Sequence, residues 1–175
     1  STILAIPPLR LPFEGSYPVS FTFGSQPEDE AIKRKFLEWG IVGHHGLDFK
    51  LPEGSEVISV DAGKVIQAGD LGDFGLTVIV THTWGSSLYA HLSQVKVQKD
   101  QEVKAGEIIA LSGQTGEAFG AHLHFGIKPV KADQNNGYLG FIDPSSYLPT
   151  IEIQKEEPKP QEEPQSIQPP QTPQI

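Results

Sequence analysis

The sequence has no cysteine among its 175 residues, which excludes disulfides and zinc sites built from thiolates. It has no methionine either, not even an initiator, so we expect Ser1 to lie downstream of a removed or missing segment. No run of about 20 apolar residues occurs, so no part of this chain is expected to span a membrane. The net charge is −9 and no basic stripe is present, which argues against a nucleic-acid partner.

The two ends of the chain differ in composition from its middle. Residues 149–175 are rich in proline, glutamine and glutamate, and such a segment cannot bury enough apolar surface to fold. We therefore predict a disordered tail or linker there. Residues 1–18 are apolar and interrupted by prolines, which predicts an extended arm over the core. Residues 19–148 are left as the one predicted domain.

Short alternating segments separated by turn signals dominate residues 19–148. This pattern predicts a mostly β fold, with an antiparallel sheet or a small barrel-like sandwich as its core. The expected strands are Val19–Phe23, Leu47–Leu51, Glu56–Val60, Gly63–Ala68, Leu76–His82, Ser87–His91, Glu102–Val103, Ile108–Leu111 and Ala121–Ile127.

The stretch Gln26–Gly40 departs from the alternating pattern. Asp29 can cap a helix, and Phe36 and Trp39 belong to a rough helical stripe. We predict a short helix or a structured loop, which either walls a cleft or simply covers the core. Near the end of the domain, Asp143–Tyr147 predicts a single capped turn.

Two histidines two residues apart, His122 and His124, lie in an expected strand. Side chains at this spacing point to the same face of a strand, so both imidazoles are expected to face one site. A buried or cleft-facing pair is costly without a partner.

A candidate partner lies upstream, where His44 and Asp48 are separated by four positions. In a straight strand they would lie about 13 Å apart, too far to share an ion, and Gly43 and Gly46 argue against a helix. A glycine-permitted bend followed by a strand from about Leu47 would bring them together.

These residues predict a metal site. His44 and Asp48, with either His122 or His124, would give three protein ligands and an open fourth position, which is typical of catalytic zinc. A third segment contains Tyr89 and His91, which share a face of an expected strand. On this evidence His91 is either catalytic or a histidine satisfied by hydrogen bonds.

Three motifs occur in a fixed order: His44-x-Gly46-x-Asp48, then Tyr89-Ala90-His91-Leu92-Ser93, then His122-Leu123-His124-Phe125. Together they resemble the lysostaphin-like zinc metallopeptidases, which cleave peptide bonds in bacterial cell walls. The resemblance covers roughly residues 19–148. It implies the family's antiparallel β-sheet core with a substrate groove, of the duplicated-hybrid-motif type, and an active peptidoglycan endopeptidase.

The resemblance also implies roles for individual residues. One Zn²⁺ would be held by His44, Asp48 and His124, while His91 and His122 would be the catalytic histidines. His45 occupies a variable position of the family and is left off the ligand set. The candidate groove residues are Tyr89, Thr115 and Phe119.

The implied substrates are peptidoglycan stem or cross-bridge peptides. The implied location is extracytoplasmic, in the bacterial cell envelope or secreted, with a signal or anchor removed. The glycine-rich loop Gln114–Gly120 lacks the lysine of a phosphate loop, so we expect it to shape the site entrance. Phe119, Ala121 and Gly126 depart from the family's usual residues, which affects loop shape and substrate fit.

Three other interpretations fit parts of the sequence. A non-haem iron oxygenase can use two histidines and a carboxylate, but His91 and His122 would then have no role. A biotinyl or lipoyl carrier would need a lysine at a hairpin tip, and no such motif is present. The third is a relative whose cleft is blocked by Gln26–Gly40 or the N-terminal arm, acting as a wall-binding module or as an activator of another wall hydrolase.

Overall fold

The structure is a computed structural model that describes residues 5–118 and 120–154. Phe119 and the part of the predicted tail from residue 155 onward lie outside the described residues. The elements in chain order are β1 (Val19–Phe21), α1 (Glu30–Trp39), β2 (Leu47–Phe49), β3 (Glu56–Ile58), β4 (Gly63–Asp70), η1 (Gly72–Phe74), β5 (Leu76–His82), β6 (Gly85–Val95), β7 (Glu102–Val103), β8 (Ile108–Ser112), β9 (Leu123–Pro129) and η2 (Ser145–Tyr147).

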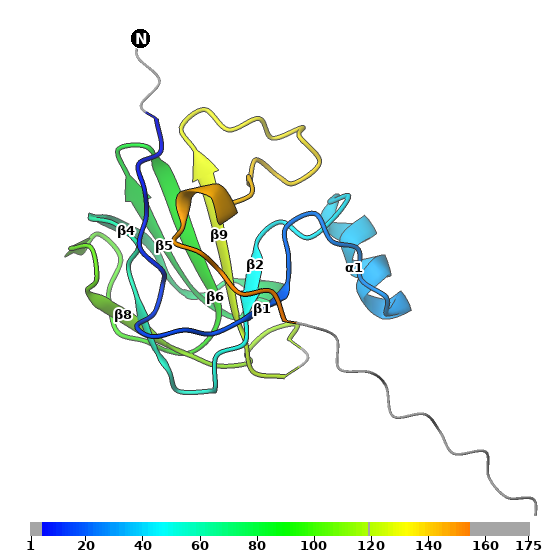
Figure 1. The fold of residues 1–175 in the computed structure, drawn as a ribbon, viewed down its shortest axis with the longest axis horizontal. Coiled ribbons are helices and arrows are strands. Elements are labelled where there is room, and N and C mark those ends of the chain that lie inside the picture. Colours follow the sequence, from blue (N-terminus) through cyan, green and yellow to red (C-terminus); the bar gives the residue numbers. More distant parts are fainter. Residues whose placement is uncertain (1–4, 119, 155–175) are drawn as a thin grey trace, which may run out of the picture.

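Within the described residues, nine strands form one antiparallel sheet (Figure 1), in the order β1-β2-β9-β6-β5-β4-β7, with β8 bridging β6 and β3. Each strand lies where alternation predicted it, and β5 and β7 have the predicted bounds. The antiparallel sheet is thus confirmed as the fold. Its order brings β2, β9 and β6 side by side, although they are far apart in the sequence.

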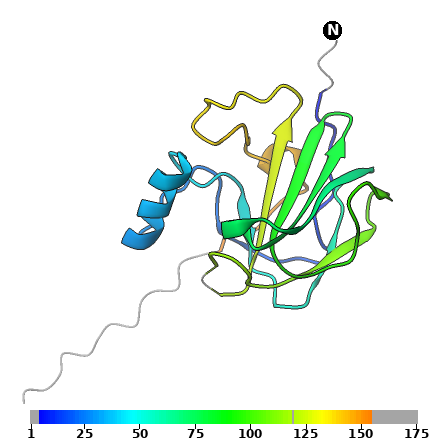
Figure 2. The same cartoon turned by 180° about the vertical axis from the view of Figure 1, so that it is seen from behind.

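One face of the sheet carries the main core. The N-terminal arm, described from residue 5, crosses this face in Figure 1, while Figure 2 shows the opposite face free of it. Leu9 and Phe13 of the arm are buried in the core, and the Leu9 amide donates to the Tyr147 carbonyl at 2.7 Å. The arm therefore seals the core side of the sheet.

The chain continues to pair after the domain boundary predicted at Leu148. The Val19 amide donates to the Glu152 carbonyl at 2.7 Å, and the Gln154 amide donates to the Val19 carbonyl at 2.8 Å. Ordered structure therefore extends to the last described residue, beside β1. The predicted turn is η2, where Asp143 accepts hydrogen bonds from the amide and hydroxyl of Ser145.

The helix α1 forms within the predicted stretch and begins at its predicted cap. The Asp29 carboxylate accepts the amides of Ala31 and Ile32, which satisfies two unpaired donors of the first turn. The helix ends at Trp39 and is capped by Gly40, which has a φ of +75°, as is common for a C-terminal glycine. In both views α1 projects to the side of the sheet, next to β1 and β2. No helix among the described residues is long and apolar enough to cross a membrane.

Candidate metal centre

The bend before β2 places His44 beside Asp48, as the glycine pattern predicted. His44 Nε2 lies 3.3 Å from Asp48 Oδ1. Gly46 is required because the bend presses against β9. A Cβ at this position would lie 2.5 Å from the Phe125 carbonyl oxygen and 2.7 Å from His124 Cε1. Only glycine lets the two segments approach this closely.

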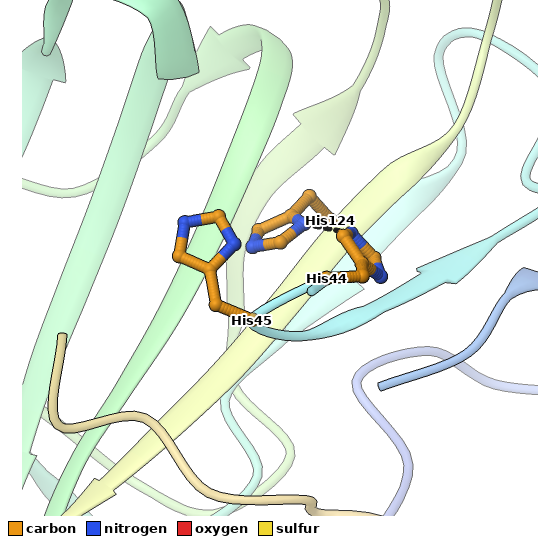
Figure 3. Close-up of side chains that lie close together, drawn as sticks. All are labelled: His44, His45 and His124. Carbon is orange, nitrogen blue, oxygen red and sulfur yellow. Dashed lines mark hydrogen bonds between the residues drawn. The ribbon is translucent and has the colours of Figure 1, made fainter. Parts of the chain in front are cut away.

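The pairing of β2 with β9 supplies the third group. Asp48 and His124 are opposite each other in the register, and His124 Nδ1 lies 3.0 Å from Asp48 Oδ1. The same nitrogen lies 3.2 Å from His44 Nε2, the contact that the dashed line in Figure 3 marks. A tetrahedral ion with bonds of about 2.0–2.1 Å separates its ligands by about 3.4 Å. The three atoms are therefore spaced as zinc ligands are.

The protonation states of His44 and Asp48 favour a cation between their facing atoms. His44 Nδ1 donates to the Thr22 carbonyl at 3.2 Å, so in the neutral ring Nε2 carries a lone pair facing the carboxylate. Burial alone would raise the pKa of Asp48, but the charge that His44 carries when protonated, and the hydrogen bonds that His124 and His44 then donate, hold it well below its usual value. Two electron-rich atoms at 3.3 Å need a proton or a metal between them, and the residues present fit zinc.

His45 belongs to the same buried cluster. His44, His45 and His124 are buried and offer nitrogens within 4.8 Å of one another, as Figure 3 shows. This arrangement could also hold a metal ion, but its spacing is looser than that of the set containing Asp48. Burial, then His124 and His44, lower the pKa of His45 to about 2, so its ring is neutral. The sequence left His45 without a role, and only its position next to the motif histidine could have drawn attention to it.

Two further histidines, His91 and His122, stand close to this centre, and backbone carbonyls fix their rings. His91 Nδ1 donates to the Thr115 carbonyl at 2.7 Å, and His122 Nδ1 donates to the Gly120 carbonyl at 3.1 Å. The rings are 4.8 Å apart, and His122 Nε2 lies 3.6 Å from Asp48 Oδ2. In each ring Nε2 is the nitrogen left for chemistry.

Burial, followed by the charges of His124 and His122, lowers the pKa of His91 to about 4. At neutral pH its ring is therefore uncharged. Because Nδ1 holds the proton, Nε2 has a lone pair and can accept one more.

The prediction that Tyr89 shares the groove face with His91 is wrong. Tyr89 is fully buried in the core, and its hydroxyl accepts the Val60 amide at 2.9 Å. Tyr89 pairs with Val78 but Leu92 pairs with Leu76, so β6 carries one extra residue between them. His91 has a φ of +58° at this bulge, which breaks the alternation and turns its ring to the groove side.

The other two candidate groove residues differ in status. The Thr115 hydroxyl donates to the Leu92 carbonyl and accepts the Leu76 amide, while its own carbonyl holds His91. Contact of Thr115 with substrate stays a prediction. Phe119 lies outside the described residues, so its predicted contact is not addressed by the structure.

A cavity of about 570 Å³ opens onto the centre. Its lining joins the metal-site residues and both further histidines to the inner side of α1, including Ile32 and Trp39. Across the opening, Lys35 Nζ lies 3.9 Å from Asp73 Oδ1 and 4.0 Å from Glu117 Oε1. The helix thus walls the cleft, one of the two roles that the sequence allowed.

Comparison with known proteins places this geometry in context. The model of peptidase family M23 matches residues 42–136, more than half of the chain. The peptidoglycan DD-endopeptidase ShyB of Vibrio cholerae is 37% identical over 122 residues, covering 66% of this chain and 29% of that protein. This chain therefore spans less than a third of the length of that relative.

Solved structures agree with the family. The catalytic domain of the antimicrobial peptidase lysostaphin from Staphylococcus simulans superposes with a TM-score of 0.61 at 27% identity, covering 75% of this chain and 91% of that domain. A zinc-containing peptidase from Vibrio cholerae gives a TM-score of 0.62 at 29% identity, covering 80% of this chain and 39% of that one. With its fold, motif order and matched residues, this chain belongs to peptidase family M23.

Proposed function

We propose that this domain is a zinc-dependent endopeptidase that hydrolyses peptide bonds in the stem or cross-bridge peptides of bacterial peptidoglycan. The observation that carries the proposal is the convergence of three ligand atoms, 3.0–3.3 Å apart, beside two histidines with fixed rings. The names of the M23 relatives support the substrate class. One zinc per chain, held by His44, Asp48 and His124, is part of the proposal.

The chemistry that zinc supplies when bound is a water of pKa about 7 and a polarised scissile carbonyl. His91 lines the cavity, and the lone pair on its Nε2 suits removal of a proton from the attacking water and its later return to the leaving amine. His122 lies next to His91, with its ring held through Nδ1. In the proposed mechanism the imidazolium form of His122 donates its Nε2–H to the carbonyl oxygen as negative charge develops there.

A blocked, non-hydrolytic relative is the alternative that the sequence left open. Two observations favour an open site. The cavity reaches the metal-site residues and both histidines, and the described part of the N-terminal arm is packed into the core. The location follows from the substrate: we propose that the domain works outside the cytoplasm, in the cell envelope or after secretion.

The test combines zinc content with release of soluble fragments from purified peptidoglycan. We expect about one zinc per chain and new amino termini in the fragments. The Asp48→Ala variant should lose both zinc and hydrolysis. The His122→Ala variant should keep zinc while hydrolysis falls by about 10²–10⁴-fold. Loss of zinc from His122→Ala would overturn the division of roles within the histidine pair, and zinc without cleavage by the wild type would favour the blocked relative.

A further inference from the structure

Two buried side-chain nitrogens have no hydrogen-bond partner among the described residues, and they belong to neighbouring rings. They are Nδ1 of His45 and Nε2 of His124. The ring centroids are 5.0 Å apart with an interplanar angle of 47°. In Figure 3 a nitrogen of His45 is turned toward the His124 ring. Buried polar atoms without partners are rare and costly, so this pair needs an explanation.

The geometry of the metal centre fixes what each nitrogen can do. His124 presents Nδ1 to Asp48 and His44. If Nδ1 binds a metal ion, the proton of the neutral ring must sit on Nε2, which then needs an acceptor. Histidines that bind metals almost always donate this second N–H to a nearby group. His44 already does so, to the Thr22 carbonyl.

For His124, the available acceptor is His45. Among the described residues His124 Nε2 has no hydrogen-bond partner, and Gly46 packs directly against that edge of the ring, where a Cβ would lie 2.9 Å from Nε2. His45 is 5% exposed. Its ring is held between Phe74, stacked at 5.5 Å, and Phe141, edge-on at 5.3 Å. Such apolar neighbours favour a neutral ring, and a neutral ring protonated on Nε2 leaves a lone pair on Nδ1.

We propose that His45 is a positioning residue of the metal centre, whose Nδ1 accepts the hydrogen bond from His124 Nε2–H and so fixes the tautomer and orientation in which His124 binds zinc. This inference rests on the proposed zinc centre. Two buried atoms that lack a hydrogen-bond partner among the described residues then satisfy each other when zinc is bound.

Two substitutions separate the acceptor from the ring. His45→Phe keeps an aromatic ring between Phe74 and Phe141 but removes Nδ1. His45→Asn loses the ring but keeps an oxygen acceptor near the position of Nδ1. Zinc dissociation constants are measured by competition with a chromophoric chelator, and the melting temperature of each zinc-free protein is measured alongside. We expect His45→Phe to weaken zinc binding by about 10–100-fold, and His45→Asn to retain most of the wild-type affinity.

A matched control replaces a buried histidine outside the centre. His82→Phe should lower the melting temperature of the zinc-free protein and leave zinc affinity unchanged. The Co²⁺-loaded proteins test whether His45 is instead a ligand, because the visible bands of Co²⁺ report its ligand set. Under the proposal, His45→Phe keeps the intensity of these bands at saturating Co²⁺.

The other outcomes overturn either the positioning role of His45 or the zinc centre itself. Wild-type affinity in His45→Phe, or equal losses in His45→Phe and His45→Asn, would overturn the role of the acceptor while the zinc centre stands. A changed Co²⁺ spectrum in His45→Phe would make His45 a ligand, again overturning the positioning role. Absence of zinc binding by the wild type would overturn the proposed zinc centre itself.

Discussion

At the scale of single residues, His91 is held in a costly backbone conformation. Its φ of +58° lies in the left-handed region that residues other than glycine seldom adopt. The Thr115 carbonyl at 2.7 Å and the pairing of β6 on both sides hold it there. Strained residues of this kind gather at functional sites, and here the strain is what moves the imidazole from the core face to the cavity.

The strain can be measured by comparing His91→Gly with His91→Ala. Both lose the imidazole, so hydrolysis should fall by about 10²–10⁴-fold in each. The left-handed conformation costs alanine about 1–2 kcal/mol, whereas the greater freedom of unfolded glycine offsets about 0.4–1 kcal/mol. The glycine variant should therefore be more stable by about 0.5–1 kcal/mol, which calorimetry of the zinc-free proteins would detect as a higher melting temperature. An alanine variant of equal or greater stability would mean that position 91 is unstrained.

His82 is a buried histidine with a structural role, and it makes stability depend on pH. It stacks on Trp84 with centroids 4.7 Å apart, and Nδ1 donates to the Ala62 carbonyl at 2.7 Å. Burial lowers its pKa from 6.5, although that hydrogen bond and Asp61 act in the opposite direction. The folded ring therefore stays neutral at a pH where the unfolded chain binds a proton. Its contribution is complete above about pH 6.5 and is lost as the pH falls through the folded pKa.

This contribution is isolated by urea unfolding of the zinc-free wild type and of His82→Phe between pH 8 and pH 5. Groups common to both proteins cancel in the difference. We expect the stability advantage of the wild type to be constant above about pH 6.5 and to shrink below it. An advantage that grows as the pH falls would mean that the folded protein favours a charged His82.

At the scale of elements, α1 was the least determined by the sequence. Asp29 and the spacing of Phe36 and Trp39 predicted a helix, and the cap is as expected. The sequence could not choose between a covering helix and a cleft wall, because that depends on which loop lies opposite. Trp39 Nε1 donates to Asp73 Oδ2 at 2.7 Å, and this contact to η1 orients the inner side of α1 toward the cavity.

The role of α1 is tested by two substitutions on the same helix. Ile32 lines the cavity, whereas Leu37 is 80% exposed. Ile32→Ser removes apolar surface that a bound peptide would cover, worth about 1–2 kcal/mol, so KM should rise by about 5–30-fold with kcat nearly unchanged. Leu37→Ser should leave both constants as in the wild type. A higher kcat/KM in Ile32→Ser would indicate that the helix obstructs the substrate.

The strands show why the sequence predicted where each strand lies better than which face of the sheet a side chain occupies. Alternation located every strand, because a half-buried sheet repeats every two residues. The same rule placed Tyr89 and His91 together and failed, since one extra residue in β6 reverses the faces beyond it. A bulge depends on the partner strands and leaves little trace in a single sequence. His45 was missed for a related reason: its neighbours become contacts only when β2 pairs with β9.

At the scale of the whole molecule, the site is assembled by sheet order. His44 precedes β2, Asp48 lies on β2, His124 lies on β9, and His91 lies on β6. These strands are adjacent in the sheet, so pairing of the motifs follows from pairing of the strands. Spacing along the chain indicated that His44 and Asp48 meet. It did not decide between His122 and His124 as the ligand; the family resemblance did, and the structure places His124 Nδ1 nearest to Asp48.

This assembly links metal binding to the stability of the entire domain. Asp48 and His124 are 76 positions apart, and a shared ion is bound only when β2 and β9 are paired. At free zinc of 100 times the dissociation constant, binding to the folded state alone adds about 2.7 kcal/mol. For a domain of this size that corresponds to a rise in melting temperature of about 5–10 °C. Calorimetry with zinc and with excess chelator measures the difference.

Asp48→Ala is the matched control for this whole-molecule effect. It removes the carboxylate shared by both histidines, so added zinc should no longer raise the melting temperature. His122→Ala should retain the full increase, because in the proposed arrangement His122 acts on the substrate and does not hold the ion. Equal zinc-induced increases in the Asp48→Ala variant and the wild type would place the metal elsewhere, with the three-histidine cluster of His44, His45 and His124 as the next set to examine.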